Sequence, residues 1–311
     1  MLSVCFYELQ IDCWHDDYFC LKGVIIIMNI KILVAHHKPG LIIKDDIYIP
    51  IQVGKAMHPD VNLGVQGDDS GENISYKNST YCEMTAWYWA WKNIKADYVG
   101  LCHYRRYFCF KEAPVLHRFS NILRYWAYFF VGNIIKPGAI VDLFQHTETT
   151  SKTKFKELAL DFSTKIPNIV ENREIDVVYQ HPYKYINLSI RRKFYEVGRF
   201  YVDLLEEIVR KYFPCFYPYL SKTLDSTTLY SCNMVIMRYE YFQDYCDTMF
   251  SILKLHEEKT LENKWCLDLL KEKSYSRVSG YLAEIITSAY IVKMQSEGKR
   301  TLEVNSVFLN I

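Results

Sequence analysis

Short apolar runs that recur along the chain constrain its fold more than any other feature of the sequence. Residues 30–35 (I-K-I-L-V-A) are followed by two histidines, a lysine, a proline and a glycine, which is typical of a buried strand that ends in a loop. Residues 97–102, 175–179 and 231–238 are apolar in the same way. We expect each of these runs to form a buried strand.

Segments with helical periodicity separate the runs. Thr80 and Glu83 have the spacing of a capping box, and Met84, Trp87 and later apolar residues recur at helical intervals, so an amphipathic helix is predicted over residues 80–95 with its aromatic stripe inward. Further helices are predicted over residues 189–212, 241–253 and 282–298. Strands that alternate with helices predict an α/β fold, a sheet covered by helices on both faces.

The composition bears on partners and compartment. A formal net charge of +1 gives no support to nucleic-acid binding through a general basic field, so any anion must be met by a local cluster. The 10 cysteines are scattered and form no C-x-x-C motif. We therefore predict free thiols, a reducing cytoplasm and no structural zinc. The 26 tyrosines and 17 phenylalanines favour half-wet clefts and interfaces.

The chain is expected to be a single domain over residues 28–311, preceded by an extension. Residues 1–27 lack the basic start of a signal peptide, and Met28 directly precedes the first strand, so we expect a poorly packed segment that an upstream start codon would explain. No apolar run approaches the roughly 20 residues of a membrane-spanning helix. Residues 111–170 show little regularity and are interpreted as an insertion or lid; its aromatic patch at 125–130 is either buried or touches a membrane or lipid carrier.

The stretch V-G-L-C-H-Y-R-R-Y-F, residues 99–108, places polar groups where a strand ends. Ligands of open α/β sheets bind just beyond the carboxyl ends of the strands. Arg105 and Arg106 offer planar forks for a phosphate or carboxylate, while His103 adds a donor and Tyr104 a stacking face. Because neighbouring side chains of a strand point to opposite faces, only one arginine is expected to touch the ligand. The alternative is that an arginine pairs with an acidic neighbour and the aromatics fill a seam.

The order of the motifs is more specific than any one of them. They are K-I-L-V-A-H-H-K-P, G-D-D-S-G-E-N-I-S, Y-C-E-M-T-A-W-Y-W-A-W-K-N, G-L-C-H-Y-R-R-Y-F, C-N-M-V-I-M and R-V-S-G-Y-L-A-E. Over about residues 29–293, the sequence resembles the bacterial capsular and lipopolysaccharide glycosyltransferase family known as domain of unknown function 4422 (DUF4422). The resemblance implies a nucleotide-diphosphosugar transferase with a GT-A-like (Rossmann-like) mixed sheet flanked by helices.

The resemblance also raises the question of a metal. A strand of the GT-A fold usually ends in D-x-D, whose carboxylates hold a divalent cation against the diphosphate, but this sequence contains no D-x-D and has H-Y-R-R at that strand end. Fixed cations can replace a metal, so we expect metal-independent transfer with Arg105 or Arg106 on the diphosphate. Asp68 and Asp69 are the alternative, as ligands of Mn²⁺ or Mg²⁺. They are otherwise a solvated turn that contacts a ribose or sugar hydroxyl.

Transfer with inversion requires a general base for the acceptor hydroxyl. In many GT-A enzymes this carboxylate lies late in the chain at the start of a helix, and Glu284 in S-G-Y-L-A-E matches that location. The alternative is that Glu284 complements the first turn of its helix. Asp225, in the preceding loop T-L-D-S-T-T, is a second candidate for the base.

Four further residues are candidates for ligand contacts. His37 ends the first strand beside His36, so one of the two is expected to line the nucleotide pocket. Asn73 and Ser75 could bind ligand hydroxyls, although both are ordinary turn formers. Asn233 lies within a predicted apolar strand, where its amide must be satisfied by backbone or by the acceptor sugar.

These expectations combine into one function and two rivals. The chain would transfer a sugar from a nucleotide donor, with UDP-linked sugars favoured and UDP-galactofuranose as one candidate, to a lipid-linked oligosaccharide in capsule, exopolysaccharide or O-antigen synthesis. It would act in the cytoplasm at the inner membrane, with no nucleic-acid partner. The first rival is a non-catalytic sugar-nucleotide or glycan-binding protein. The second, a phosphotransferase, is weakened by the lack of a G-x-x-x-x-G-K-[ST] loop.

Overall fold

A computed structural model describes residues 28–111, 123, 140–141, 146–262 and 276–310. The extension at 1–27 and the aromatic patch at 125–130 lie outside these ranges, so the predictions made for them stay predictions. Among the helices of the described ranges, none is both long enough and apolar enough to cross a membrane.

The four predicted strands lie together in one mixed sheet. They are β1 (Ile30–His36), β4 (Tyr98–His103), β8 (Val177–Gln180) and β11 (Val235–Arg238). β1 is parallel to β4, whereas β11 is antiparallel to both β4 and β8. The carboxyl ends of β1, β4 and β8 and the amino end of β11 therefore meet at one edge of the sheet. β11 is shorter than predicted because η3 (Ser231–Asn233) precedes it as a 3₁₀ turn.

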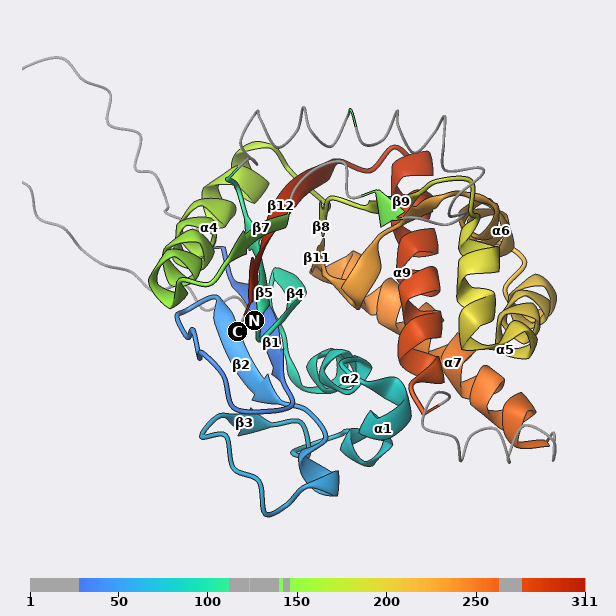
Figure 1. Cartoon of the computed structure of the whole chain (residues 1–311), viewed down its shortest axis with the longest axis horizontal. Coiled ribbons are helices and arrows are strands. Elements are labelled where there is room, and N and C mark those ends of the chain that lie inside the picture. The colour runs from blue at the N-terminus through green and yellow to red at the C-terminus, as the bar shows by residue number, and fades with distance from the viewer. Residues whose placement is uncertain (1–27, 112–122, 124–139, 142–145, 263–275, 311) are drawn as a thin grey trace, which may run out of the picture.

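Five further strands complete this sheet. β2 (Tyr48–Gln52) and β3 (Gln66–Gly67) extend it in parallel beyond β1. β5 (Arg106–Cys109) turns back from β4, and β12 (Thr301–Leu309) is antiparallel to β5 and parallel to β8 (Figure 1). β7 (His146–Thr149) pairs in parallel with the carboxyl half of β12, beyond the residues that pair with β8. Because β11 pairs with both β8 and β4, the hydrogen-bonded strands form a closed circuit, β4–β11–β8–β12–β5.

A small second sheet lies beside this edge. It contains β6 (Ile140–Val141), β9 (Tyr183–Tyr185) and β10 (Thr228–Leu229), paired in the order β10–β9–β6. Since β9 follows β8 closely and β10 comes directly before η3, this sheet flanks the carboxyl ends of the main strands.

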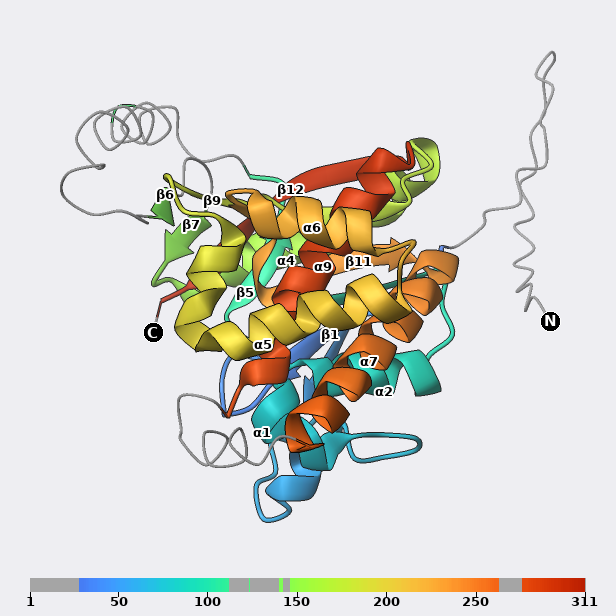
Figure 2. The same ribbon diagram turned by 90° about the vertical axis from the view of Figure 1, so that its right-hand side faces the viewer.

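Helices cover both faces of the main sheet, as predicted. β1 shows why: Leu33 and Ala35 pack into one core cluster, and Ile32 and Val34 pack into the other. Side chains of a strand alternate between faces, so each face of the sheet has its own apolar layer. One layer is covered by α4 (Lys152–Asn172) and the other by helices that pack in two tiers (Figures 1 and 2). The second group comprises α2 (Met84–Asn93), α5 (Ile190–Tyr212), α6 (Tyr217–Asp225), α7 (Tyr239–Glu262) and α9 (Val278–Ser296).

The expectation that residues 111–170 form an irregular insertion is wrong for the part occupied by α4. Phe155, Ala159 and Phe162 have no exposed surface, and Ile166 and Val170 continue the same buried stripe. These residues lie at helical spacing and bury one face of the sheet. α4 is therefore a structural layer of the domain and not a lid.

The predicted helix over residues 80–95 is interrupted. α1 (Asn78–Tyr81) ends at Cys82, whose φ of 53° and ψ of −131° are incompatible with a helix, and α2 begins at Met84. The predicted capping box does not form: the Thr80 hydroxyl donates to the Lys77 carbonyl at 3.2 Å, within the preceding turn. The inward aromatic stripe of α2 is confirmed by Trp87, which is fully buried.

Candidate functional site

Cys232 is the centre of a polar cluster at the sheet edge where β1, β4 and β8 end. Its carbonyl bonds to Nε2 of His103 at 2.8 Å, and its thiol contacts the guanidinium of Arg106. Its backbone N–H donates to Oε1 of Glu284 at 3.0 Å. One residue of η3 thus joins the end of β4, the start of β5 and helix α9.

The backbone of this turn is unusual at Cys232 and Asn233, and the side chain of Asn233 is hydrogen-bonded through both of its polar atoms. Cys232 and Asn233 have φ values of 63° and 52°, in the left-handed region that few side chains adopt. The Asn233 amide donates to Oε1 of Glu83 and accepts from Oγ1 of Thr287, each at 2.8 Å. Asn233 has no exposed surface. It precedes β11 instead of lying within a strand, and both polar atoms of its buried amide are hydrogen-bonded to other side chains.

Glu284 is the predicted base, and it has an altered proton affinity. Burial raises the pKa of Glu284 to about 7, and the nearby charge of Glu83 adds to this effect. The Cys232 amide and the guanidiniums of Arg106 and Arg277 act in the opposite direction. Because α9 begins at Val278, Glu284 lies in the second turn and does not complement the first, so the alternative explanation fails. Its carboxyl can exchange a proton near neutral pH.

Arg105 and Arg106 both lie at this edge, and because Arg105 is in the turn between β4 and β5, the alternation expected of neighbouring strand residues does not apply to them. Their guanidinium carbons lie 5.3 and 5.4 Å from the ring centre of Phe308. Among the residues that the structure describes, the buried Nε atoms of both have no hydrogen-bond partner. Burial raises the pKa of the Cys232 thiol to about 11, so the thiol that contacts Arg106 is neutral, and Glu284 is the carboxyl that favours the charged form of Arg106. The edge is thus prepared for an anion.

The surroundings of His37 confirm that cations gather here. Partial burial lowers the pKa of His37, and the nearby Lys38, His103, Arg277 and Arg105 lower it further. These side chains come from the loop after β1, the β4–β5 turn and the residue before α9. They converge although they are far apart in the sequence.

Tyr104 does not offer the stacking face expected of it. Only 5% of its surface is exposed. His37 meets the Tyr104 ring edge-on at 5.0 Å, and the cations of Lys38 and Arg105 lie 5.7 and 5.2 Å from its centre. Gly40 lies so close that a Cβ there would come within 3.0 Å of the ring. The tyrosine is a support for the cations around it.

Asp68 and Ser75 both follow β3 and lie at this edge, where they connect their own loop to the loop after β2. The Asp68 carboxylate is buried and accepts from the backbone N–H of Gly54 at 2.9 Å and of Lys55 at 3.1 Å, as well as from the Ser75 hydroxyl. Asn73 accepts from the Ser75 N–H at 3.2 Å and donates to the carbonyl of Asp69. Of the four predicted contacts in this segment, only Asp69 is exposed.

A divalent metal does not fit these residues. The end of β4, where a D-x-D motif would stand, carries His103, Arg105 and Arg106, and both oxygens of Asp68 already accept hydrogen bonds. Within the described ranges, no group of three or more His, Cys, Asp and Glu side chains is arranged to hold a metal ion.

Asp225 lies apart from the cluster. It ends α6, is exposed, and forms an ion pair with Arg191 at 3.3 Å; Arg191 also holds Glu206. It makes no contact with Cys232 or Glu284, so the geometry favours Glu284 as the base.

Glu83, Cys232 and Arg277 belong to the site and were not predicted. The spacing of Thr80 and Glu83 indicated a cap, which is a complete local explanation of Glu83 and conceals its long-range contact. Arg277 stands in the R-V-S-G-Y-L-A-E motif, and its Nε donates to the Cys82 thiol at 3.3 Å. The motif as a unit was the available signal for Arg277.

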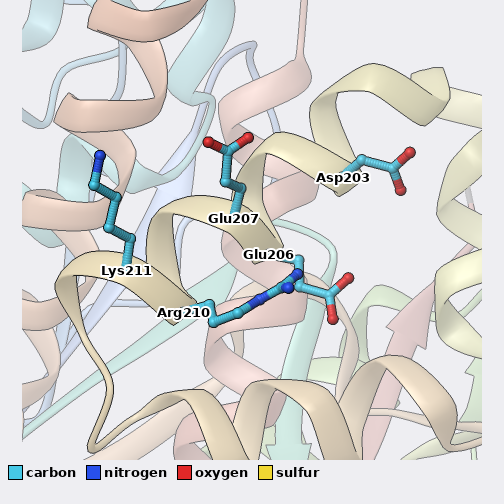
Figure 3. A pocket seen from close by; sticks show the side chains of 5 residues that line it. All are labelled: Asp203, Glu206, Glu207, Arg210 and Lys211. Atoms are coloured by element: carbon cyan, nitrogen blue, oxygen red, sulfur yellow. The ribbon is translucent and has the colours of Figure 1, made fainter.

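A surface hollow on α5 is unrelated to this cluster (Figure 3). Two of its acids are paired, Glu206 with Arg191 and Asp203 with Arg199. The residues that line it come from one helix: Asp203, Glu206, Glu207, Arg210 and Lys211. Because these two acids already pair with nearby arginines, we take the carboxyl ends of the strands, and not this hollow, as the candidate site.

The chain is similar to known proteins at the level of a family and of a solved structure. Residues 31–295 match the family model described as a domain of unknown function, DUF4422. Among solved structures, the chain is similar to the apo form of the bifunctional glycosyltransferase WbbM, with 27% sequence identity and a TM-score of 0.70. The similarity covers 91% of this chain and 46% of that one, so the chain spans less than half of the length of WbbM. No curated protein matches the sequence.

Proposed function

The chain belongs to the DUF4422 family, and from this premise we propose that it is a glycosyltransferase of GT-A-like fold that uses a nucleotide-diphosphosugar. The family match and the similarity to a bifunctional glycosyltransferase support the reaction class. Ligands of α/β sheets bind beyond the carboxyl ends of the strands, which is where the polar cluster around Cys232 lies.

One observation carries the proposal. Two arginines, Arg105 and Arg106, share one sheet edge with Glu284, a carboxyl whose pKa is about 7. A transferase needs both features together: positive charge for the departing nucleoside diphosphate and a proton acceptor for the attacking hydroxyl. A binding module has no need of the second.

The proposed step is a displacement with inversion. The acceptor oxygen forms a bond to the anomeric carbon while the bond from that carbon to the phosphate oxygen breaks. The hydroxyl proton passes to the ionised carboxylate of Glu284, and the electron pair leaves with the nucleoside diphosphate. Arg105, Arg106 and Arg277 stabilise the charge that develops on the diphosphate, and the turn at Cys232 fixes the Glu284 carboxyl.

We propose transfer without a metal, since the residues at the end of β4 are cationic and Asp68 is committed to its own loop. His37 and Asp69 have exposed side chains and are proposed to contact the donor. A UDP-linked sugar is the proposed donor, with UDP-galactofuranose as one candidate. The proposed acceptor is a lipid-linked oligosaccharide of capsule, exopolysaccharide or O-antigen synthesis, met at the cytoplasmic face of the inner membrane.

A thermal-shift panel on the full chain tests the proposal. UDP, GDP and CMP with their common sugars are compared in EDTA and then in Mn²⁺. A ligand at a hundred times its dissociation constant should add about 2.7 kcal/mol to the free energy of unfolding. Stabilisation by one nucleotide class in EDTA is the expected result. A shift only in Mn²⁺ would contradict the role of the arginines, and no shift with any nucleotide would contradict the transferase.

A further inference from the structure

The corner between α1 and α2 brings Glu83 into the site. Cys82 forms this corner with its non-helical φ of 53°, and its thiol accepts from Nε of Arg277 at 3.3 Å. A Cβ added at Gly280 of α9 would come within 3.0 Å of the same thiol, so the corner packs tightly against α9. Strained backbone of this kind persists where the surroundings impose it, and it is enriched at functional sites.

Glu83 and Glu284 are held by two consecutive residues of one turn. The Cys232 N–H donates to Glu284, and the Asn233 amide donates to Glu83 at 2.8 Å. Asn233 is fixed in turn by Thr287, whose hydroxyl also bonds to a buried tyrosine at 2.8 Å. Asn233 and Thr287 are fully buried. The relative placement of the two carboxyl groups is therefore set by a rigid, satisfied network.

The negative charge of Glu83 acts on the carboxyl group of Glu284. After burial, it is the largest influence that disfavours the ionised form of Glu284. The groups that face Glu284 come from every element around it: Cys82 and Glu83 at the α1–α2 corner, Arg106 of β5, Tyr185 of β9, Cys232 of η3, and Arg277 before α9. Arg106 and Arg277 favour the ionised form of Glu284. Without the carboxylate of Glu83, burial and these two cations would therefore give Glu284 a lower pKa.

We propose that Glu83 is a positioning residue for Glu284: the turn at Cys232 and Asn233 holds both carboxyl groups, so the charge of Glu83 acts on the proposed base. The catalytic part of this inference rests on the proposed function, whereas the coupling of the two carboxyl groups does not. An anionic neighbour makes Glu284 a stronger base, and the arginines keep it from staying protonated at neutral pH. The proton affinity of Glu284 is thus set by opposing charges, one carboxylate and two arginines, around a carboxyl group that the turn holds in place.

The test measures protonation directly, without a substrate. The carbonyl stretch of protonated Glu284 is identified by infrared difference spectra of the full chain and its Glu284→Gln variant, and its titration midpoint is then measured. Glu83→Gln retains an oxygen that accepts from Asn233 and loses the charge. We expect it to lower the midpoint by about one pH unit. Glu83→Asp keeps the charge and should keep the midpoint closer to that of the unchanged protein.

Controls separate charge from structure. Glu258→Gln removes an exposed charge of α7 and should leave the midpoint unchanged. Glu83→Ala is a second neutral variant, to be used if Glu83→Gln does not fold, and its midpoint should move in the same direction. An unmoved midpoint in a folded neutral variant would overturn the inference.

Turnover distinguishes the inference from the proposed function. With UDP-galactofuranose or the donor selected by thermal shift, the acidic limb of the rate profile in Glu83→Gln should move with the infrared midpoint. A moved midpoint with no turnover of any nucleotide sugar would overturn the transferase and leave the carboxyl pair intact. Turnover whose acidic limb ignores Glu83 would overturn the inference alone.

Discussion

The carboxyl group of Glu284 combines the two properties that a general base needs, a fixed position and a proton affinity matched to neutral pH. Its position comes from the Cys232 N–H, and its affinity from burial beside Glu83. The guanidinium of Arg106 contacts the thiol of the same cysteine, so the proposed base and this cation are both held by Cys232. Each of these side chains can be tested by a change that preserves its shape.

Glu284→Gln should abolish proton transfer and keep the donor site. We expect turnover to fall by about 10² to 10⁴-fold, the usual contribution of a positioned base, with nucleotide-sugar affinity nearly unchanged. Initial rates and calorimetric titration of the donor measure the two quantities. Unchanged turnover would remove Glu284 from the mechanism, and a binding module would show no turnover to lose.

The raised pKa of Glu284 also predicts a dependence of stability on pH. The folded protein binds this proton more tightly than the unfolded chain, whose pKa is 4.5, so ionisation between pH 4.5 and about 7 lowers the free energy of unfolding. Glu284→Gln lacks this loss. The variant should gain on the order of 2 kcal/mol relative to the unchanged protein between pH 4.5 and pH 8. Urea unfolding at both pH values would show an equal difference if the group were not perturbed.

Among the elements, α4 is the one whose role was least evident beforehand. Polar residues, with Pro167 inside the helix, conceal its apolar stripe, and that stripe becomes meaningful only against the aromatic face of β5. Phe162 stacks on Phe108 at 5.5 Å and on Phe110 at 4.7 Å between ring centres. The helix thus belongs to the core of the molecule.

Phe162→Ala should therefore lower the free energy of unfolding by about 3–5 kcal/mol, since a fully buried aromatic is lost and a cavity remains. Lys165→Ala on the exposed side of α4 is the matched control and should stay within about 0.5 kcal/mol. Urea unfolding measures both. Equal stability of the two variants would return α4 to the status of a lid.

The elements that the sequence predicted correctly are those whose signal is local. The strands β1, β4 and β8 are apolar runs, and His103, Arg105 and Arg106 stand at a strand end that a resemblance also indicates. Glu83 and Cys232 could not be predicted in this way. Their roles depend on positive φ angles at Cys82, Cys232 and Asn233, which residue type does not reveal.

β12 shows the same limit for the whole sheet. Its alternation of apolar and polar residues is weak, so no strand is predicted there from the sequence. It nevertheless lies between β8 and β5 and completes the circuit of strands. Pairing with strands that are distant in the sequence, and not periodicity, decides its place.

Removal of residues 300–311 should consequently prevent folding of the whole domain. The deletion leaves β8 and β5 with open edges and exposes Val304, Val307 and Leu309 of the core, so no cooperative thermal transition is expected. Deletion of Ile311 alone is the control and should leave the transition in place. Cooperative unfolding of the longer deletion would show that the circuit is dispensable.

The position of β12 has a consequence for how the protein is made. The ribosome adds residues 301–309 after every other strand of the sheet, although two of those strands need β12 between them. Until this segment emerges, β8 and β5 of the nascent chain lack a hydrogen-bonded neighbour on one side, and for β5 this is next to Arg106, its first residue. Assembly of the sheet edge that holds Arg106 therefore waits until β12 has emerged, and chaperones have most to protect just before it.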